Sequence, residues 1–242
     1  VASTLREPGL ARALLEAGAE VDLGHREDGT TPLYAAAHER LPGTVRLLLD
    51  AGADVNKGRA SDGASPLYVA AITGHQDIVV MLLEAGASVD GARVTDGATP
   101  LCAAAHMGFL ETARTLVDAG ADVDRLISEG GCSILYQGVE QGFLTMAKTL
   151  VAVGADVNWS HPDTGATPLH AAVLEGDVCM TRVLVEAGAD VNQALKPTGC
   201  TALHAAANTG YLRIVTLLTE AGADVNQCRT DNGTTPLYRA AS

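Results

Sequence analysis

Two histidines, His170 and His204, have the type and spacing that first suggest chemistry, because they stand 34 residues apart in the similar segments TPLHAA and TALHAA. Paired imidazoles can ligate a metal ion or exchange protons with a substrate. Tyrosine stands at the same place in other copies of the segment, at Tyr34, Tyr68, Tyr136 and Tyr238. Because tyrosine substitutes there, the pattern favours hydrogen bonding to a neighbouring turn over a shared metal or acid–base role.

Other patterns that carry catalytic chemistry are absent from the sequence. It contains no GxxxxGK[ST], HExxH, GxSxG or GxGxxG pattern, and its remaining histidines occupy scattered positions. Asp28, Asp62 and Asp96 each precede a glycine but lack the alternate carboxylates of a calcium loop, so they are predicted to form turns. The sequence therefore predicts a protein that is not an enzyme, with no catalytic, cofactor-binding or metal-binding residues.

The elements that hold these residues recur with an uninterrupted period of 34 residues. A leucine and a glycine mark every copy, at Leu33, Leu67, Leu101, Leu135, Leu169, Leu203 and Leu237, and at Gly18, Gly52, Gly86, Gly120, Gly154, Gly188 and Gly222. In one copy, Thr31 is predicted to cap an inner helix that begins at Pro32. Val45 and Leu48 then indicate an outer helix, which Gly52 ends in a left-handed conformation. A turn-rich segment follows, which we call the finger.

The segments TPLHAA (167–172), GHQDIVVMLLEAGA (74–87) and GADVN (188–192) resemble ankyrin repeats. The resemblance covers essentially the whole chain. It implies an all-α repeat solenoid of stacked helix-turn-helix units with protruding β-hairpin fingers, as a single array over residues 1–242. That array would hold about seven repeats, partial at both ends. Because neither end has a polar capping repeat, we expect the chain to be a segment of a longer protein.

Asparagines recur at the base of the fingers, at Asn56, Asn158, Asn192 and Asn226. We expect their side chains to form hydrogen bonds within the base of their own finger. The resemblance to ankyrin repeats also permits hydroxylation at such asparagines.

Composition narrows the cellular setting and the partner class. The 242 residues carry a formal net charge of −13 and only 3% aromatic residues, which disfavours nucleic acid as a partner. No apolar run reaches the ~18 residues that span a bilayer, so no membrane insertion is expected. Five cysteines without CxxC spacing point to a reducing, cytoplasmic compartment, where they act as small apolar residues.

The variable finger positions hold many of the chain's cations, which gives two alternatives. Seven of the sixteen Lys and Arg residues lie in fingers: Arg26, Lys57, Arg59, Arg93, Arg125, Lys196 and Arg229. One alternative is a locally basic face that binds an acidic patch on a peptide or protein. The other is that these cations balance nearby carboxylates such as Asp28, Asp62 and Asp231.

Apolar finger residues indicate a second candidate contact. Trp159 is the only tryptophan and lies in a finger with His161, while the preceding finger carries Leu126 and Ile127. An exposed tryptophan beside aliphatic residues is typical of a binding hot spot. Between these fingers, the segment GGCSILYQGV (130–139), which contains Tyr136, lacks the usual proline and carries a helix-weakening glycine. It is either a hinge, part of the binding site, or drift.

Together these patterns predict a non-enzymatic scaffold that binds a protein or peptide through a concave face of fingers and inner helices, centred on repeats four and five. A structural spacer or assembly element in a larger complex is the main alternative. A substrate-recognition adaptor for an enzyme such as a ubiquitin ligase is another. The sequence does not specify an oligomeric state.

Overall fold

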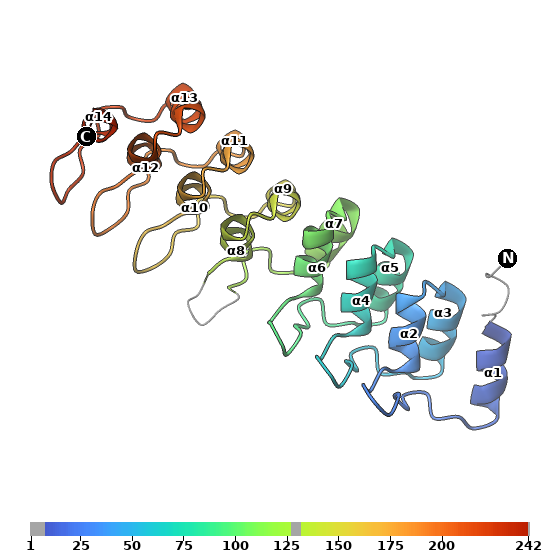
Figure 1. Ribbon diagram of the computed structural model, residues 1–242. Coiled ribbons are helices and arrows are strands. Elements are labelled where there is room, and N and C mark those ends of the chain that lie inside the picture. The colour runs from blue at the N-terminus through green and yellow to red at the C-terminus, as the bar shows by residue number, and fades with distance from the viewer. Residues whose placement is uncertain (1–7, 127–131, 242) are drawn as a thin grey trace. The chain divides into compact units, whose positions relative to one another are not determined.

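The computed structural model describes residues 8–126 and 132–241, drawn as ribbons in Figure 1. The chain divides into two compact units, Val1–Asp122 and Val123–Ser242, which we call unit 1 and unit 2. Each unit is a stack of paired helices, as the predicted repeat solenoid requires. A single array over residues 1–242 stays a prediction. Within the described residues, we find no helix whose length and apolar character would let it cross a membrane.

The helices alternate between an inner and an outer row in each unit. Unit 1 contains α1 (Pro8–Glu16), α2 (Pro32–His38), α3 (Pro42–Asp50), α4 (Pro66–Thr73), α5 (Gln76–Glu84), α6 (Pro100–Met107) and α7 (Leu110–Asp118). Unit 2 contains α8 (Ile134–Glu140), α9 (Leu144–Ala152), α10 (Pro168–Leu174), α11 (Val178–Glu186), α12 (Ala202–Thr209), α13 (Leu212–Glu220) and α14 (Pro236–Ala241). Within each unit, even-numbered inner helices pack on one another, and odd-numbered outer helices do the same (Figure 1).

The predicted helix signals act as expected. The Thr31 hydroxyl accepts a hydrogen bond from the backbone N–H of Tyr34 at 3.2 Å, which satisfies a free donor at the start of α2. Gly52 follows α3 with a φ of 84°, so a left-handed residue ends the outer helix as predicted. These local signals repeat, and the six copies from α2/α3 to α12/α13 therefore form the same helix pair.

The core consists of small and aliphatic side chains. The marker leucine of the inner helix is at most 2% exposed in six copies, at Leu33, Leu67, Leu101, Leu135, Leu169 and Leu203. Burial of each such side chain contributes about 1.5–3 kcal/mol to folding. Alanines follow the leucine in most copies and are also buried, which lets neighbouring inner helices approach closely. Small and aliphatic side chains therefore make up most of the core, which also contains the rings of Tyr34 and Tyr68.

The finger-base asparagines correct one expectation. Asn158 accepts a hydrogen bond from the backbone N–H of Asp190 at 2.7 Å and donates one to the Gly188 carbonyl at 3.3 Å. Asn192 repeats both contacts one copy further on. These side chains therefore join adjacent repeats, as Asn56 does by accepting from the Ser88 N–H, and the prediction of bonds within their own finger base was wrong for these three asparagines. The reason is the stacking register, which places the backbone of the next copy within reach of a short amide.

The irregular fourth copy forms a complete inner helix. Ser133 caps α8 by accepting a hydrogen bond from the Tyr136 N–H at 3.1 Å. Gly138 is buried within the helix, where the other copies carry alanine. A β-carbon at Gly138 would lie 3.3 Å from the Met146 sulfur, which is a tight contact with a flexible side chain.

We predict that Gly138→Ala stabilises unit 2 by about 1 kcal/mol, because alanine loses less conformational freedom in a helix. The next copy carries Ala172 and Met180 at the same two positions, both almost fully buried, which shows that the pair can be packed. Urea unfolding at neutral pH would measure the change. A destabilised variant would mean that Met146 cannot move aside.

Candidate protein-interaction surface

The two histidines of the inner helices are structural. The Nδ1 atom of His170 accepts a hydrogen bond from the backbone N–H of Thr167 at 3.3 Å, and its Nε2 atom lies 3.4 Å from the Cys200 carbonyl. His204 makes the equivalent contacts with Thr201 and Thr234, at 3.2 Å each. An accepting Nδ1 leaves the proton on Nε2, which donates to the neighbouring turn as predicted. Neither ring has a free lone pair for a metal ion.

Burial decides the charge state of these rings. His170 and His204 are 3% and 1% exposed, and burial lowers the pKa of both imidazoles. They are therefore neutral at physiological pH and contribute to stability, not to proton exchange. Among the described residues, no three His, Cys, Asp or Glu side chains gather in a way that could hold a metal ion.

Two of the predicted finger cations in unit 1 are held by internal partners. Arg59 donates to both carboxylate oxygens of Asp62, at 3.1 and 2.6 Å, and its guanidinium lies over the Tyr34 ring at 5.3 Å. Arg93 pairs with Asp96 in the same way and lies over the ring of Tyr68. The hydrogen bonds from Arg59 lower the pKa of Asp62.

The other predicted cations differ in their surroundings. Arg26 is exposed on the first finger, and Lys57 donates from Nζ to the Asp22 carbonyl at 3.0 Å. In unit 2, Arg229 pairs with Asp231, Lys196 donates from Nζ to the Pro162 carbonyl, and Arg125 is partly buried. Internal pairing thus accounts for Arg59, Arg93 and Arg229, whereas Arg26 and Lys57 remain on the surface of unit 1.

Three of the predicted contact residues gather in unit 2. The rings of Tyr136 and Trp159 have centroids 5.2 Å apart at 60°, in an edge-on arrangement, and His161 lies 6.2 Å from Trp159. Inner helix α8 supplies Tyr136, and the following finger supplies Trp159 and His161. Leu126 is 55% exposed and forms an isolated backbone bridge with Ser133, the cap residue of α8. Ile127 lies outside the described residues.

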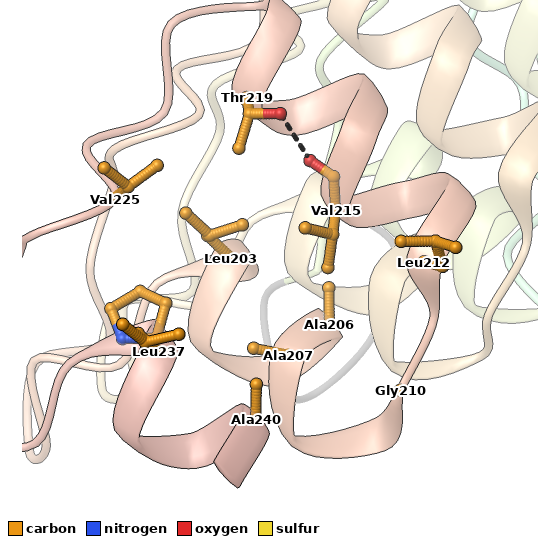
Figure 2. A pocket seen from close by; sticks show the side chains of 11 residues that line it. Leu203, Ala206, Ala207, Gly210, Leu212, Val215, Thr219, Val225, Leu237 and Ala240 are labelled. Carbon is orange, nitrogen blue, oxygen red and sulfur yellow. Dashed lines mark hydrogen bonds between the residues drawn. The ribbon is translucent and has the colours of Figure 1, made fainter.

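The structure also shows an apolar pocket that sequence analysis missed. It has a volume of about 320 Å³ and lies between α12, α13 and α14. Figure 2 shows Leu203, Val215 and Leu237 among its lining side chains. Leu237 is 76% exposed, whereas its six counterparts are buried, and Leu212 is 75% exposed. Leu237 lies in the last of the seven copies, and among the described helices none follows α14 to cover it, so its exposure follows from its position in the sequence.

Comparisons with known proteins agree with this architecture. The family model described as "Ankyrin repeats (3 copies)" matches residues 1–93, 89–161, 135–229 and 192–242. No curated protein matches the chain. Among solved structures, the ankyrin repeat domain of Bcl-3, described as a unique member of the IkappaB protein family, is similar with a TM-score of 0.74 and 28% identity, covering 89% of this chain and 96% of that one.

The human ASB11 ankyrin repeat domain is similar with a TM-score of 0.63 and 29% identity, covering 87% of this chain and 91% of that one. Family match, helix-pair stacking and repeat period all agree along the chain. This protein therefore belongs to the ankyrin repeat family.

Proposed function

We propose that this protein is a non-enzymatic interaction module that binds a protein or peptide partner through the fingers and inner helices of unit 2. Ankyrin repeats generally mediate protein–protein interaction. The observation that carries the proposal is the contact of Tyr136 with Trp159 beside the exposed side chain of Leu126. Tryptophan and tyrosine dominate binding hot spots because they bury a large area at a low cost in conformational entropy.

The scaffold supports this use of the aromatic pair. Ser133 fixes the start of α8, which holds Tyr136, and the next finger returns along a backbone hydrogen bond from His161 N–H to the Ala166 carbonyl at 2.8 Å. Trp159 is half-buried against Tyr136, so its ring is already ordered before a partner arrives. A preformed contact loses little further entropy on binding.

An acidic segment on the partner is a secondary element of the proposal. Arg26 and Lys57 are exposed in unit 1 and could contact it. Arg59 and Arg93 would have to exchange Asp62 and Asp96 for an external carboxylate, which gains little. The same pairing disfavours contact with the phosphates of a nucleic acid, as does the net charge of −13.

The double variant Trp159→Ala and Leu126→Ala is expected to weaken partner binding by about thirty-fold or more, which corresponds to a hot spot of about 2 kcal/mol. Leu126 is largely exposed and Trp159 is half-buried, so the free energy of unfolding should fall by about 1 kcal/mol, mainly through the lost contact with Tyr136. Quantitative capture of cellular proteins on immobilised wild-type and variant chains, read by mass spectrometry, would measure the loss. Equal capture by both chains would reject this surface.

The second candidate function is that of an assembly element, and the apolar pocket of unit 2 favours it. In the stack, an outer helix covers its predecessor, as α13 covers α11. The pocket could accept an amphipathic helix of a partner in the same manner. Leu212→Glu serves as the matched variant in the capture experiment. Loss of capture with Leu212→Glu alone would assign partner binding to the pocket and not to Trp159.

An adaptor role for an enzyme such as a ubiquitin ligase would use the same surface. Identification of the captured protein as a ligase component or substrate would support that role.

A further inference from the structure

Tyr136 and its finger neighbour have counterparts at equivalent positions in two other repeats. A tyrosine in the first turn of an inner helix is followed, 25 residues later, by a finger side chain: Tyr34 by Arg59, Tyr68 by Arg93, and Tyr136 by His161. These three pairs occupy equivalent positions of the repeat. A comparison of the three pairs therefore shows which finger side chain lies near each tyrosine ring.

In unit 1 the position is occupied by a cation from the same chain. The guanidinium carbon of Arg59 lies 5.3 Å from the Tyr34 ring centroid, and that of Arg93 lies 4.9 Å from the Tyr68 ring centroid. Asp62 and Asp96 hold the two guanidinium groups in place. The rings are only 8% and 6% exposed. A tyrosine face with a nearby carboxylate is thus a guanidinium site in this fold.

Beside Tyr136 this arginine is missing. His161 stands at its position, and Thr164 stands where Asp62 stands in unit 1. Tyr136 is more open than Tyr34, and Trp159 adds a second aromatic ring. Tryptophan offers the most favourable ring face for a cation.

Two exposed carboxylates, Glu140 and Asp163, belong to the elements that carry this aromatic pair. Glu140 lies one helical turn beyond Tyr136 on α8 and is exposed. Burial raises the pKa of the Tyr136 phenol, and the negative charge of Glu140 raises it further, so the two groups are electrostatically coupled. Asp163 is exposed in the finger and donates its backbone N–H to His161 Nδ1 at 3.3 Å. Lys196 brings a positive charge to this finger, where its Nζ donates to the Pro162 carbonyl, so Glu140 on α8 is the carboxylate that favours a positive ligand at the Tyr136 ring.

Building on the proposed binding function, we propose that Tyr136 and Trp159 receive the guanidinium of an arginine carried by a basic segment of the partner, with Glu140 as the nearby countercharge. Arginine fits better than lysine, because its planar, weakly hydrated guanidinium stacks on aromatic faces. The partner's arginine takes the place that Arg59 and Arg93 occupy in unit 1. Unlike Tyr34 and Tyr68, Tyr136 has no arginine of its own chain over its ring among the described residues.

The double variant His161→Arg and Thr164→Asp tests this proposal, because it supplies the internal arginine and carboxylate of unit 1. Thr164 accepts a hydrogen bond from the Ala166 N–H at 3.2 Å, as Asp62 does from Ala64 at 3.1 Å, so the turn should be preserved. The control, Leu195→Arg and Thr198→Asp, makes the same replacements one repeat later, beside His170. Both variants have the same net charge.

Trp159 is the only tryptophan, so its fluorescence reports directly on the site. The probes are the blocked peptide GRGRGRGRG and a matched peptide in which uncharged citrulline replaces each arginine. We expect saturable arginine-peptide binding to the wild type and the control, and at least about five-fold weaker binding to His161→Arg/Thr164→Asp. Tyr136→Leu should weaken binding similarly, whereas Tyr136→Phe should retain it. These two variants also provide the test if the double variant does not fold.

Equal binding of the arginine and citrulline peptides would overturn the proposal, as would full binding by both His161→Arg/Thr164→Asp and Tyr136→Leu. The capture experiment separates this failure from failure of the proposed function. If Trp159→Ala/Leu126→Ala loses the partner while the arginine peptide shows no preference, the binding surface stands and arginine recognition is wrong. If that variant keeps the partner, the binding surface itself is wrong.

Discussion

Acidification from about pH 7.5 to about pH 5.5 is expected to destabilise unit 2 by up to about 2.7 kcal/mol through His170 and His204. Both imidazoles are buried, and their Nδ1 atoms accept hydrogen bonds from the backbone at the starts of α10 and α12. A protonated imidazole cannot accept there, so protonation would remove the capping contact and place a charge in the interior.

The direction follows from proton binding in the two states. Burial is the main cause of the lowered pKa of both folded histidines, and the positive charges of Arg229 and Arg239 lower that of His204 further. The unfolded chain binds protons near the ordinary pKa of about 6.5. The stabilisation is therefore complete above about pH 6.5 and is lost as the pH falls toward the folded pKa, with at most about 1.36 kcal/mol per pH unit for each histidine.

Urea unfolding at both pH values, monitored by the hydrogen exchange of the α10 and α12 amides, would measure this loss. The variant His170→Tyr/His204→Tyr provides the control, because tyrosine occupies the same position at Tyr34, Tyr68 and Tyr136. Asp62 and Asp96 have lowered pKa values, so they stay ionised throughout this range. An unchanged pH dependence in the tyrosine variant would show that other groups cause the loss.

Asp62→Asn is expected to destabilise unit 1 by about 2 kcal/mol, because charge-assisted hydrogen bonds contribute about 1.5–3 kcal/mol. The Asp62 side chain is 13% exposed, accepts two hydrogen bonds from Arg59 and lies 3.9 Å from a nitrogen of Arg93. Asparagine keeps the acceptor for the Ala64 N–H but removes the negative charge between two guanidinium groups. The Arg59 guanidinium would remain over Tyr34 without its counterion.

Asp96→Asn is the matched control in the next finger. The Asp96 side chain pairs with Arg93 but is 45% exposed, so solvent screens the interaction and the expected loss is below about 1 kcal/mol. Urea unfolding of both variants at low and high salt would compare them. Equal losses for the two variants would contradict the view that burial of Asp62 between two fingers sets the larger effect.

The pairing of charges in these two fingers could not be predicted from the sequence. The sequence contained both Asp62 and Arg59, and it left open whether the finger cations form a binding face or balance carboxylates. That choice depends on side-chain geometry, because a bidentate contact requires the finger to turn Arg59 back onto Asp62 and over the Tyr34 ring. Charge and spacing alone do not specify such a turn.

The candidate site was partly predictable for a similar reason. Tyr136, Trp159 and His161 were predicted from their types and from their places in the repeat, and the fold brings them together. Their mutual contact joins residues of two successive copies, so it depends on the stacking register. The same register places the backbone N–H of Asp190 within hydrogen-bonding distance of Asn158, whereas a bond within its own finger was expected.

The sequence by itself determined the family, the helix pairs and the buried leucines, because these follow from local signals that recur every 34 residues: a hydroxyl cap, apolar residues at helical spacing and a terminating glycine. Only the tertiary structure shows which copies of a repeated residue differ in burial and in contact partners. Asp62 lies between two guanidinium groups while its counterpart Asp96 is more exposed, and Tyr136 contacts a tryptophan where Tyr34 contacts an arginine. The physical reason is that exposure, ring contact and ion pairing depend on the neighbouring repeat, which the residue's own segment does not encode.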